Sequence, residues 1–133
     1  MHEPVLISVH DESDVGRVVF KTQRFAREIG FNKVDEARLA TIASELATNI
    51  VRYADRGQIA LRWLVSPLEG LAIESTDHGP GIENVELALE DHQTTTRNSL
   101  GLGLPGVKRM ADAFEIESIP GRGLRVLATR WLP

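Results

Sequence analysis

The chain has 133 residues, a formal net charge of −4 and no cysteine, and 42% of its residues are hydrophobic. This length suits one domain, 1–133, that buries about 70% of its unfolded surface without a disulfide or structural metal. Charges of both signs are scattered along the chain, so nucleic acid is not an expected partner. No apolar run reaches the roughly 20 residues of a membrane helix, and no secretion signal is recognised. A cytoplasmic protein without membrane association is therefore expected.

Hydrophobic spacing and turn residues predict an alternation of strands and helices along the chain. In order, the predicted elements are a strand at 4–10, helices at 11–30 and about 34–54, strands at 57–65 and 70–77, a short helix at 82–91, a polar stretch at 92–99, a glycine loop that becomes a helix over 100–114, and strands at 114–119 and 124–132. Most strands are connected as hairpins and alternate apolar with polar residues. This pattern predicts an α+β two-layer sandwich with a mixed, mostly antiparallel sheet and the helices on one face.

The stretch "IASELATNIVRYA" combines a core-facing helix with two polar residues on its flank. The predicted apolar face of this helix contains Leu39, Ile42, Ala43, Leu46, Ile50 and Tyr53. Glu45 and Asn49 lie about 40° apart beside that face, and side chains one turn apart can reach the same ligand. Their oxygen atoms suit Mg²⁺, and a carboxylate can accept a proton from a hydroxyl or water. By itself, the pair also fits a solvated helix edge.

The stretch "STDHGPGI" places a carboxylate at the end of a strand and two glycines directly after it. Asp77 fits an Asx-type turn in which the side chain caps its own loop. As a hydrogen-bond acceptor, it also suits the exocyclic amine of adenine. Gly79 and Gly81 remove side chains, which would let a base and sugar approach the backbone. Both interpretations remain open on this motif alone.

A second glycine motif, "SLGLGLPGVKRM", leads from a loop straight into a helix. Gly101 and Gly103 precede Pro105, a residue that the first turn of a helix accepts. Free N–H groups at such an end favour an anion, although a tight turn before an ordinary helix fits equally. The motif matches neither the P-loop nor the dinucleotide fingerprint. The polar segment before it could close over a phosphate with Arg97 as a positive charge, or be a solvated loop.

These motifs occur in an order that resembles the GHKL ATPase superfamily. E-L-A-x-N on a helix, D-x-G-x-G after a strand, G-x-G before a helix and "PGRG" before the last strand correspond to its N box, glycine boxes and final G-x-G. The stretches "VDEARLATIASELATNI", "GPGI" and "GLGLPGVKRMADAF" are similar to bacterial anti-sigma serine kinases, and "LGLPGVKRM" and "WLP" favour the RsbT-type switch kinases of the stressosome. The resemblance implies a Bergerat-type fold that binds ATP and Mg²⁺.

The resemblance also implies a role for each motif. Glu45 would be the general base, Asn49 would coordinate Mg²⁺ and Asp77 would accept a hydrogen bond from adenine. The glycines of the first box, Gly79 and Gly81, would leave room for the base. The phosphates would lie against a backbone segment that the resemblance assigns to the second glycine box: Gly101, Leu102, Gly103 and Leu104.

The implied activity is a serine/threonine protein kinase that phosphorylates STAS-domain antagonist and scaffold proteins. When released by them, it would bind an output enzyme such as a PP2C-type phosphatase. One departure favours a rival, a GHKL-fold anti-sigma factor or nucleotide-gated binding switch with little kinase activity. Leu124 stands where the family usually has a threonine that supports the adenine-binding aspartate. A lost polar partner at a buried site costs about 1–3 kcal/mol.

Overall fold

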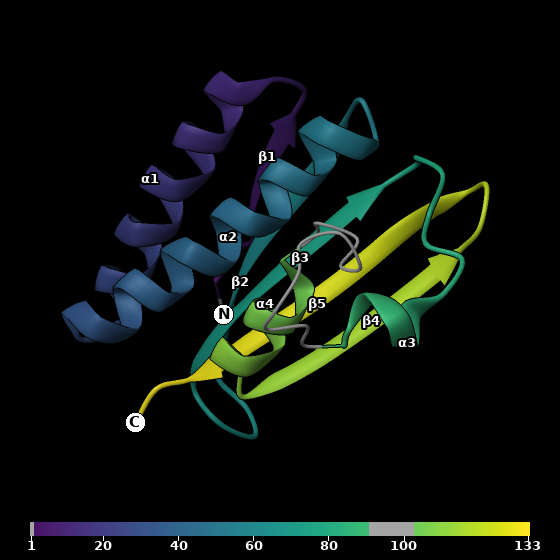
Figure 1. Cartoon of the computed structure of the whole chain (residues 1–133). Helices are drawn as coiled ribbons and strands as arrows, with labels where there is room; N and C mark the ends of the chain where they lie inside the picture. The colour runs from purple at the N-terminus through teal and green to yellow at the C-terminus, as the bar shows by residue number, and fades with distance from the viewer. Residues whose placement is uncertain (1, 91–102) are drawn as a thin grey trace.

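The computed structural model describes residues 2–90 and 103–133, and its elements follow the predicted order (Figure 1). They are β1 Val5–Val9, α1 Glu12–Ile29, α2 Lys33–Tyr53, β2 Gly57–Leu64, β3 Gly70–Asp77, α3 Val85–Ala88, α4 Leu104–Met110, β4 Ala113–Ile119 and β5 Gly123–Trp131. The largest departure is α3, which is four residues long instead of spanning 82–91. Its start is set by Asn84, whose side chain accepts a hydrogen bond from the Leu87 N–H at 2.9 Å.

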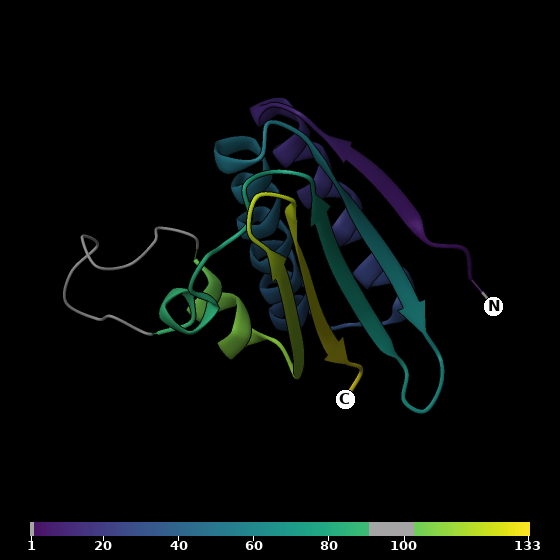
Figure 2. The ribbon, with the colours of Figure 1, turned by 90° about the vertical axis from the view of Figure 1, so that its right-hand side faces the viewer.

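The five strands form one sheet in the order β1-β2-β3-β5-β4. All of its pairings are antiparallel, so the predicted mixed sheet is wrong in this detail, while the α+β sandwich is confirmed. The reason lies in the first connection: the chain reverses three times, into α1, into α2 and into β2, so β2 runs antiparallel to β1. Figure 2 shows these two long helices packed together against one face of the sheet. None of the helices in the described ranges is apolar over a length that could cross a membrane.

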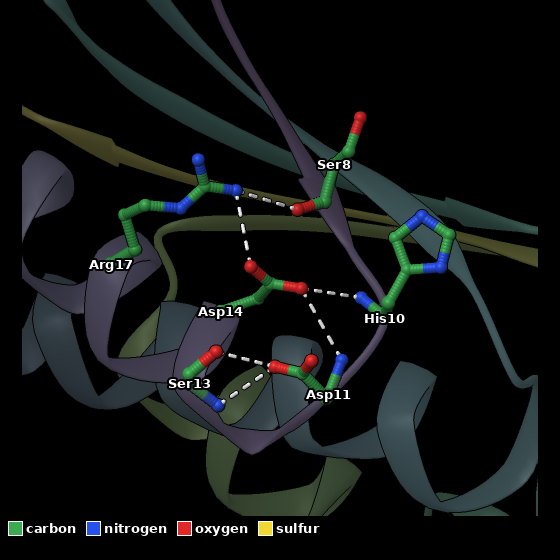
Figure 3. Close-up of polar contacts among 6 residues, drawn as sticks. All are labelled: Ser8, His10, Asp11, Ser13, Asp14 and Arg17. Carbon is green, nitrogen blue, oxygen red and sulfur yellow. Dashed lines mark hydrogen bonds and ion pairs between the residues drawn. The ribbon is translucent and has the colours of Figure 1, made fainter.

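The start of α1 is held by a reciprocal cap that also ties the helix to β1 (Figure 3). Asp11 accepts a hydrogen bond from the Ser13 N–H at 3.0 Å, while Asp14 accepts from the backbone N–H of His10 at 2.8 Å. Arg17 donates to the Ser8 carbonyl at 3.0 Å and pairs with Asp14. The backbone N–H of His10, then that of Asp11 and the Arg17 charge, lower the pKa of Asp14. This cap fixes the entry of α1 onto the sheet.

The N-terminal half of α2 is anchored by a buried ion pair that joins distant parts of the chain. Asn32 caps the helix by accepting from the Asp35 N–H at 2.8 Å. The Asp35 carboxylate accepts from Arg130 of β5 at 2.6 Å, and both side chains are largely buried. The same guanidinium donates to the carbonyl of Met110 at the end of α4. Arg130 therefore ties α2, α4 and β5 together at one end of the sandwich.

Candidate active site

A cavity of about 410 Å³ lies between the C-terminal half of α2, the end of β3 and the segment that leads into α3. Its volume falls within the range of small-molecule sites. Apolar side chains and a few polar groups line it: Asn49, Tyr53, Ala54, Asp77, Pro80, Gly81, Ile82, Glu83, Asn84, Leu87 and Leu124. The cavity thus gathers residues from the helix motif, from the first glycine motif and from the start of β5.

Asn49 and Asp77 are both buried, each with 8% of its surface exposed, and both line this cavity. Asn49 comes from α2 and Asp77 is the last residue of β3. Buried polar side chains need hydrogen-bond partners or a ligand. The structure therefore places two of the predicted site residues in the lining of one cavity, where a ligand would contact both.

Asp77 makes the local turn that the sequence suggested and still faces the cavity. Its Oδ1 accepts a hydrogen bond from the Gly79 N–H at 2.9 Å. A carboxylate has about four acceptor positions, so this bond leaves capacity for a donor in the cavity. The structural and ligand-binding interpretations of Asp77 are therefore compatible.

Glu45 lies one turn before Asn49 on α2, half-buried, and outside the lining of the cavity. Its carboxylate packs against the bare backbone of Gly103, where a Cβ atom would collide with Oε2 and Cδ. Gly103 also has φ +66°, a conformation that strains residues with a side chain. Gly103, the described glycine of the second motif, thus packs directly on the predicted base.

The glycines of the first motif allow close packing of the chain on itself. A Cβ on Gly79 would come within 2.8 Å of Ala54 at the end of α2. Gly81, at φ +71°, lies against the carbonyl oxygens of Ile119 and Gly123 and the hydroxyl of Ser118. The Ser118 hydroxyl donates to the Ile82 carbonyl at 2.9 Å and accepts from the Ile82 N–H at 2.6 Å. These contacts shape one wall of the cavity; the predicted room for a base stays a prediction.

Sequence reasoning misassigned Tyr53 and passed over several apolar lining residues. Tyr53 was placed on the core face of its helix, but it is 45% exposed and lines the cavity. Tyr53 is the last residue of α2, and its side chain lies at the cavity instead of in the core. Its spacing of one turn from Asn49 was the available signal. Ile82, Asn84 and Leu87 carried no comparable signal because their place depends on the fold of the loop.

The second glycine motif is described only from Gly103 onward. Arg97, Gly101 and Leu102 lie outside the described residues. Leu104 is fully buried, so its side chain belongs to the core. Any contact that Leu104 makes with a phosphate would have to use its backbone.

Within residues 2–90 and 103–133, no three His, Cys, Asp or Glu side chains are gathered as a metal cluster. A hard cation with few protein ligands is nevertheless compatible with this site, because Mg²⁺ is commonly held by one or two side-chain oxygens together with substrate phosphates and water. The buried amide of Asn49, at the end of the cavity nearest Glu45, has the right chemistry for one such ligand.

The antiparallel sheet covered by helices, and the cavity between α2 and the strand-end aspartate, define a histidine kinase-like ATPase domain. A sequence profile of that domain matches residues 9–130, so the chain belongs to this family. Solved structures agree on the fold. The catalytic domain of the histidine kinase ThkA superposes with a TM-score of 0.57 at 16% identity, over 99% of this chain and all of that one.

Within the family, the similarity points to protein kinases. The chain is 38% identical to the serine/threonine-protein kinase RsbT of Bacillus subtilis (strain 168), over 99% of both chains. It is 29% identical to the anti-sigma F factor of Thermoanaerobacter sp. (strain X514), over 81% of this chain and 78% of that protein. The SiaB–SiaC complex of Pseudomonas aeruginosa contains a chain with the same fold, at a TM-score of 0.66 and 12% identity over 94% and 89% of the two chains. The protein thus belongs with the ATP-dependent serine/threonine kinases of the RsbT group, as the sequence predicted.

Proposed function

We propose that the protein is a switch kinase that transfers the γ-phosphoryl group of ATP to a serine or threonine of a STAS-domain partner. The observation that carries this proposal is the placement of Asn49 and Asp77 in one cavity, with Glu45 one helical turn before Asn49 on α2. The full-length similarity to RsbT supports the same activity. The similarity to anti-sigma factors supports a role in partner switching.

The base of the nucleotide occupies the cavity and its phosphates point toward Glu45. Asp77 accepts a hydrogen bond from the adenine amine with the acceptor capacity that Gly79 leaves unused. Leu87, Ile82 and Leu124 supply apolar surface around the base. The backbone at Gly103 and Leu104, together with Gly101, Leu102 and Arg97, is proposed to contact the phosphates. Burial of the base orients the phosphates for transfer.

Glu45 and Asn49 share the chemistry between them. Asn49 supplies an oxygen ligand, and Mg²⁺, when bound, neutralises charge on the phosphates. The Glu45 carboxylate accepts the proton of the partner hydroxyl as its oxygen bonds to the γ-phosphorus. The bond from that phosphorus to the bridging oxygen breaks, and ADP leaves with the electron pair. The protein contributes position and one proton acceptor, which is most of what phosphoryl transfer demands.

The cellular role we infer is a switch between two partners. Unphosphorylated STAS-domain antagonists or scaffolds sequester the kinase, and their phosphorylation releases it. The released kinase then binds an output enzyme, such as a PP2C-type phosphatase. The similarity to RsbT and the anti-sigma F factors is the support for this scheme.

The activity is tested with purified protein, a STAS-domain antagonist and labelled ATP. Glu45→Ala and Asn49→Ala should each reduce the rate of transfer by about 10²–10⁴-fold. A positioned general acid or base usually contributes a rate factor of this size. Thr48→Ala is the matched control, because Thr48 lies between them on α2 and does not line the cavity. Transfer that survives both active-site changes would contradict the assigned roles.

A second candidate, a nucleotide-gated binding switch with little kinase activity, is favoured by Leu124. This residue is half-buried in the cavity beside Asp77 and offers no hydrogen bond. The same assay separates the candidates. Binding of ATP and partner without transfer to any STAS-domain protein would support the binding switch and overturn the kinase.

A further inference from the structure

A second hollow lies on the other side of Glu45 from the nucleotide cavity. It is an open groove of about 430 Å³ between the N-terminal half of α2 and the end of α4. Six residues line it: Lys33, Val34, Ala37, Arg38, Thr41 and Met110. Val34 is 60% exposed although it is apolar. We refer to these six residues as the α2–α4 groove.

The order of residues along α2 places Glu45 between the two hollows. Thr41 of the groove is one turn before Glu45, and Asn49 of the cavity is one turn after it, each about 6 Å away along the helix axis. Helix α4 lies beside α2 (Figure 1), with Gly103 against Glu45 and Met110 in the groove. The groove therefore leads along α2 and α4 to the carboxylate of the base.

Phosphoryl transfer needs the attacking hydroxyl and the leaving oxygen roughly in line on opposite sides of the phosphorus. With the nucleotide on the Asn49 side of Glu45, the groove on the Thr41 side is a hollow along α2 that is left for the hydroxyl. We propose that the α2–α4 groove docks the segment of the partner protein that carries the target serine or threonine. This inference rests on the proposed kinase function and adds the surface at which its protein substrate binds.

The composition of the groove indicates the chemistry of that segment. Val34, Ala37 and Met110 form an apolar floor, and Lys33 and Arg38 give it a basic rim, although Arg38 also pairs with Asp35 at 3.3 Å. An apolar side chain flanked by carboxylates is the complementary partner, since charge complementarity steers encounter and sets register. No acidic residue lines the groove among the residues described.

The walls of the groove are held in place before any partner binds. Arg130 donates to Asp35 of α2 at 2.6 Å and to the Met110 carbonyl of α4. One guanidinium thus fixes the separation of the two helices that form the groove. Such preorganisation lowers the cost of ordering the surface on binding.

The test uses two substitutions that should leave the fold intact. Val34→Asp and Lys33→Glu place acidic groups in the first turn of α2, where the helix dipole favours negative charge. Val65→Asp is the matched control, because Val65 is 58% exposed in the β2–β3 connection and does not line the groove. A purified STAS-domain antagonist serves as the probe, with labelled ATP for transfer and a non-hydrolysable ATP analogue for calorimetry.

Each groove variant should raise the KM for the STAS-domain protein, and weaken its binding, by about tenfold, and the double variant by more. Affinity for the ATP analogue and the melting temperature should match those of Val65→Asp. If the wild type transfers phosphate and the groove variants keep its KM and binding affinity for the STAS-domain protein, the groove proposal is overturned while the kinase proposal stands. If the wild type binds the STAS-domain protein without transferring phosphate, and only the groove variants lose that binding, the kinase proposal is overturned and the docking groove stands. A wild type that neither binds nor phosphorylates the probe would overturn both.

Discussion

Both halves of α2 contain buried polar side chains, and Asp35 and Asn49 show that such residues have different roles. Asp35, in the N-terminal half, is paired with Arg130 and belongs to the internal structure. Asn49, in the C-terminal half, faces a cavity of about 410 Å³. Burial alone therefore does not mark a functional residue. What distinguishes the two is that Asn49 lines this cavity and Asp35 does not.

The sharpest way to test this comparison is to remove the partner of Asp35. Arg130→Met should lower the free energy of unfolding by about 3–5 kcal/mol, because it removes the buried partner of Asp35 and leaves that carboxylate only the half-exposed Arg38 at 3.3 Å. Urea denaturation measures the change. Asn49→Ala is the comparison variant and should stay within about 1.5 kcal/mol of wild type. Equal decreases in the free energy of unfolding in both variants would mean that Asn49 is as important to the stability of the fold as the Asp35 ion pair.

The functional half is tested at Asp77. Asp77→Asn replaces an acceptor with a group that can present a donor to the adenine amine, so ATP affinity should fall by about 10–100-fold. Isothermal calorimetry gives the affinity, and thermal melting should show little change. Asp112→Asn, which alters an exposed carboxylate bonded to the Trp131 N–H, is the control. An unchanged Kd for Asp77→Asn would remove the adenine assignment.

A smaller effect is expected at Leu124, on the β5 side of the same cavity. Leu124→Thr adds a hydroxyl beside the buried Asp77 carboxylate, and one such hydrogen bond is worth about 1 kcal/mol. ATP should bind up to about tenfold more tightly in the same calorimetric experiment. Weaker binding would indicate that the apolar surface of Leu124 contributes more to the cavity than a polar partner of Asp77.

The smallest effect is expected where an ion pair lies at the surface of the sheet instead of under α2. Burial opposes ionisation of Glu74, but hydrogen bonds from Arg125 at 2.6 Å and Arg62 at 3.3 Å, with their charges, keep its pKa below the usual value. Because the pKa of Glu74 is lower in the folded state, its ionised form stabilises the protein at pH values above the unfolded pKa of about 4.3. This stabilisation is lost as the pH falls through the folded pKa.

The magnitude distinguishes Glu74 from Asp35. Both arginines are substantially exposed, so the contribution of Glu74 should be below about 1 kcal/mol. Denaturation of wild type and Glu74→Gln, compared between pH 7 and pH 3, measures it. The two proteins should converge in stability at the lower pH. A difference that persists at pH 3 would show that the effect is packing and not charge.

Local patterns were sufficient for the elements and for part of the site. The 3.6-residue spacing of apolar side chains identified α1 and α2, and it placed Glu45 and Asn49 on the flank of the core face. Period-two alternation and turn residues identified the hairpins. These features depend on residues within about one or two turns of each other, and such short-range relationships can be read from the chain.

The remaining features depend on contacts between distant residues. The insertion of β5 between β3 and β4, the antiparallel course of the whole sheet and the exposure of Tyr53 follow from how the elements pack. The Arg130–Asp35 pair joins residues 95 positions apart, and no local spacing predicts it.

The sequence by itself determined which residues could carry the chemistry: a carboxylate and an amide one turn apart, a strand-end aspartate and glycines without side chains. Only the tertiary structure decided where these residues meet and that Glu45 packs on Gly103. It also decided that a groove opens on the side of Glu45 away from the nucleotide cavity. The physical reason is that side-chain chemistry and helical spacing are local properties of the chain. A cavity, by contrast, is bounded by surfaces that come together only when the sheet and helices pack.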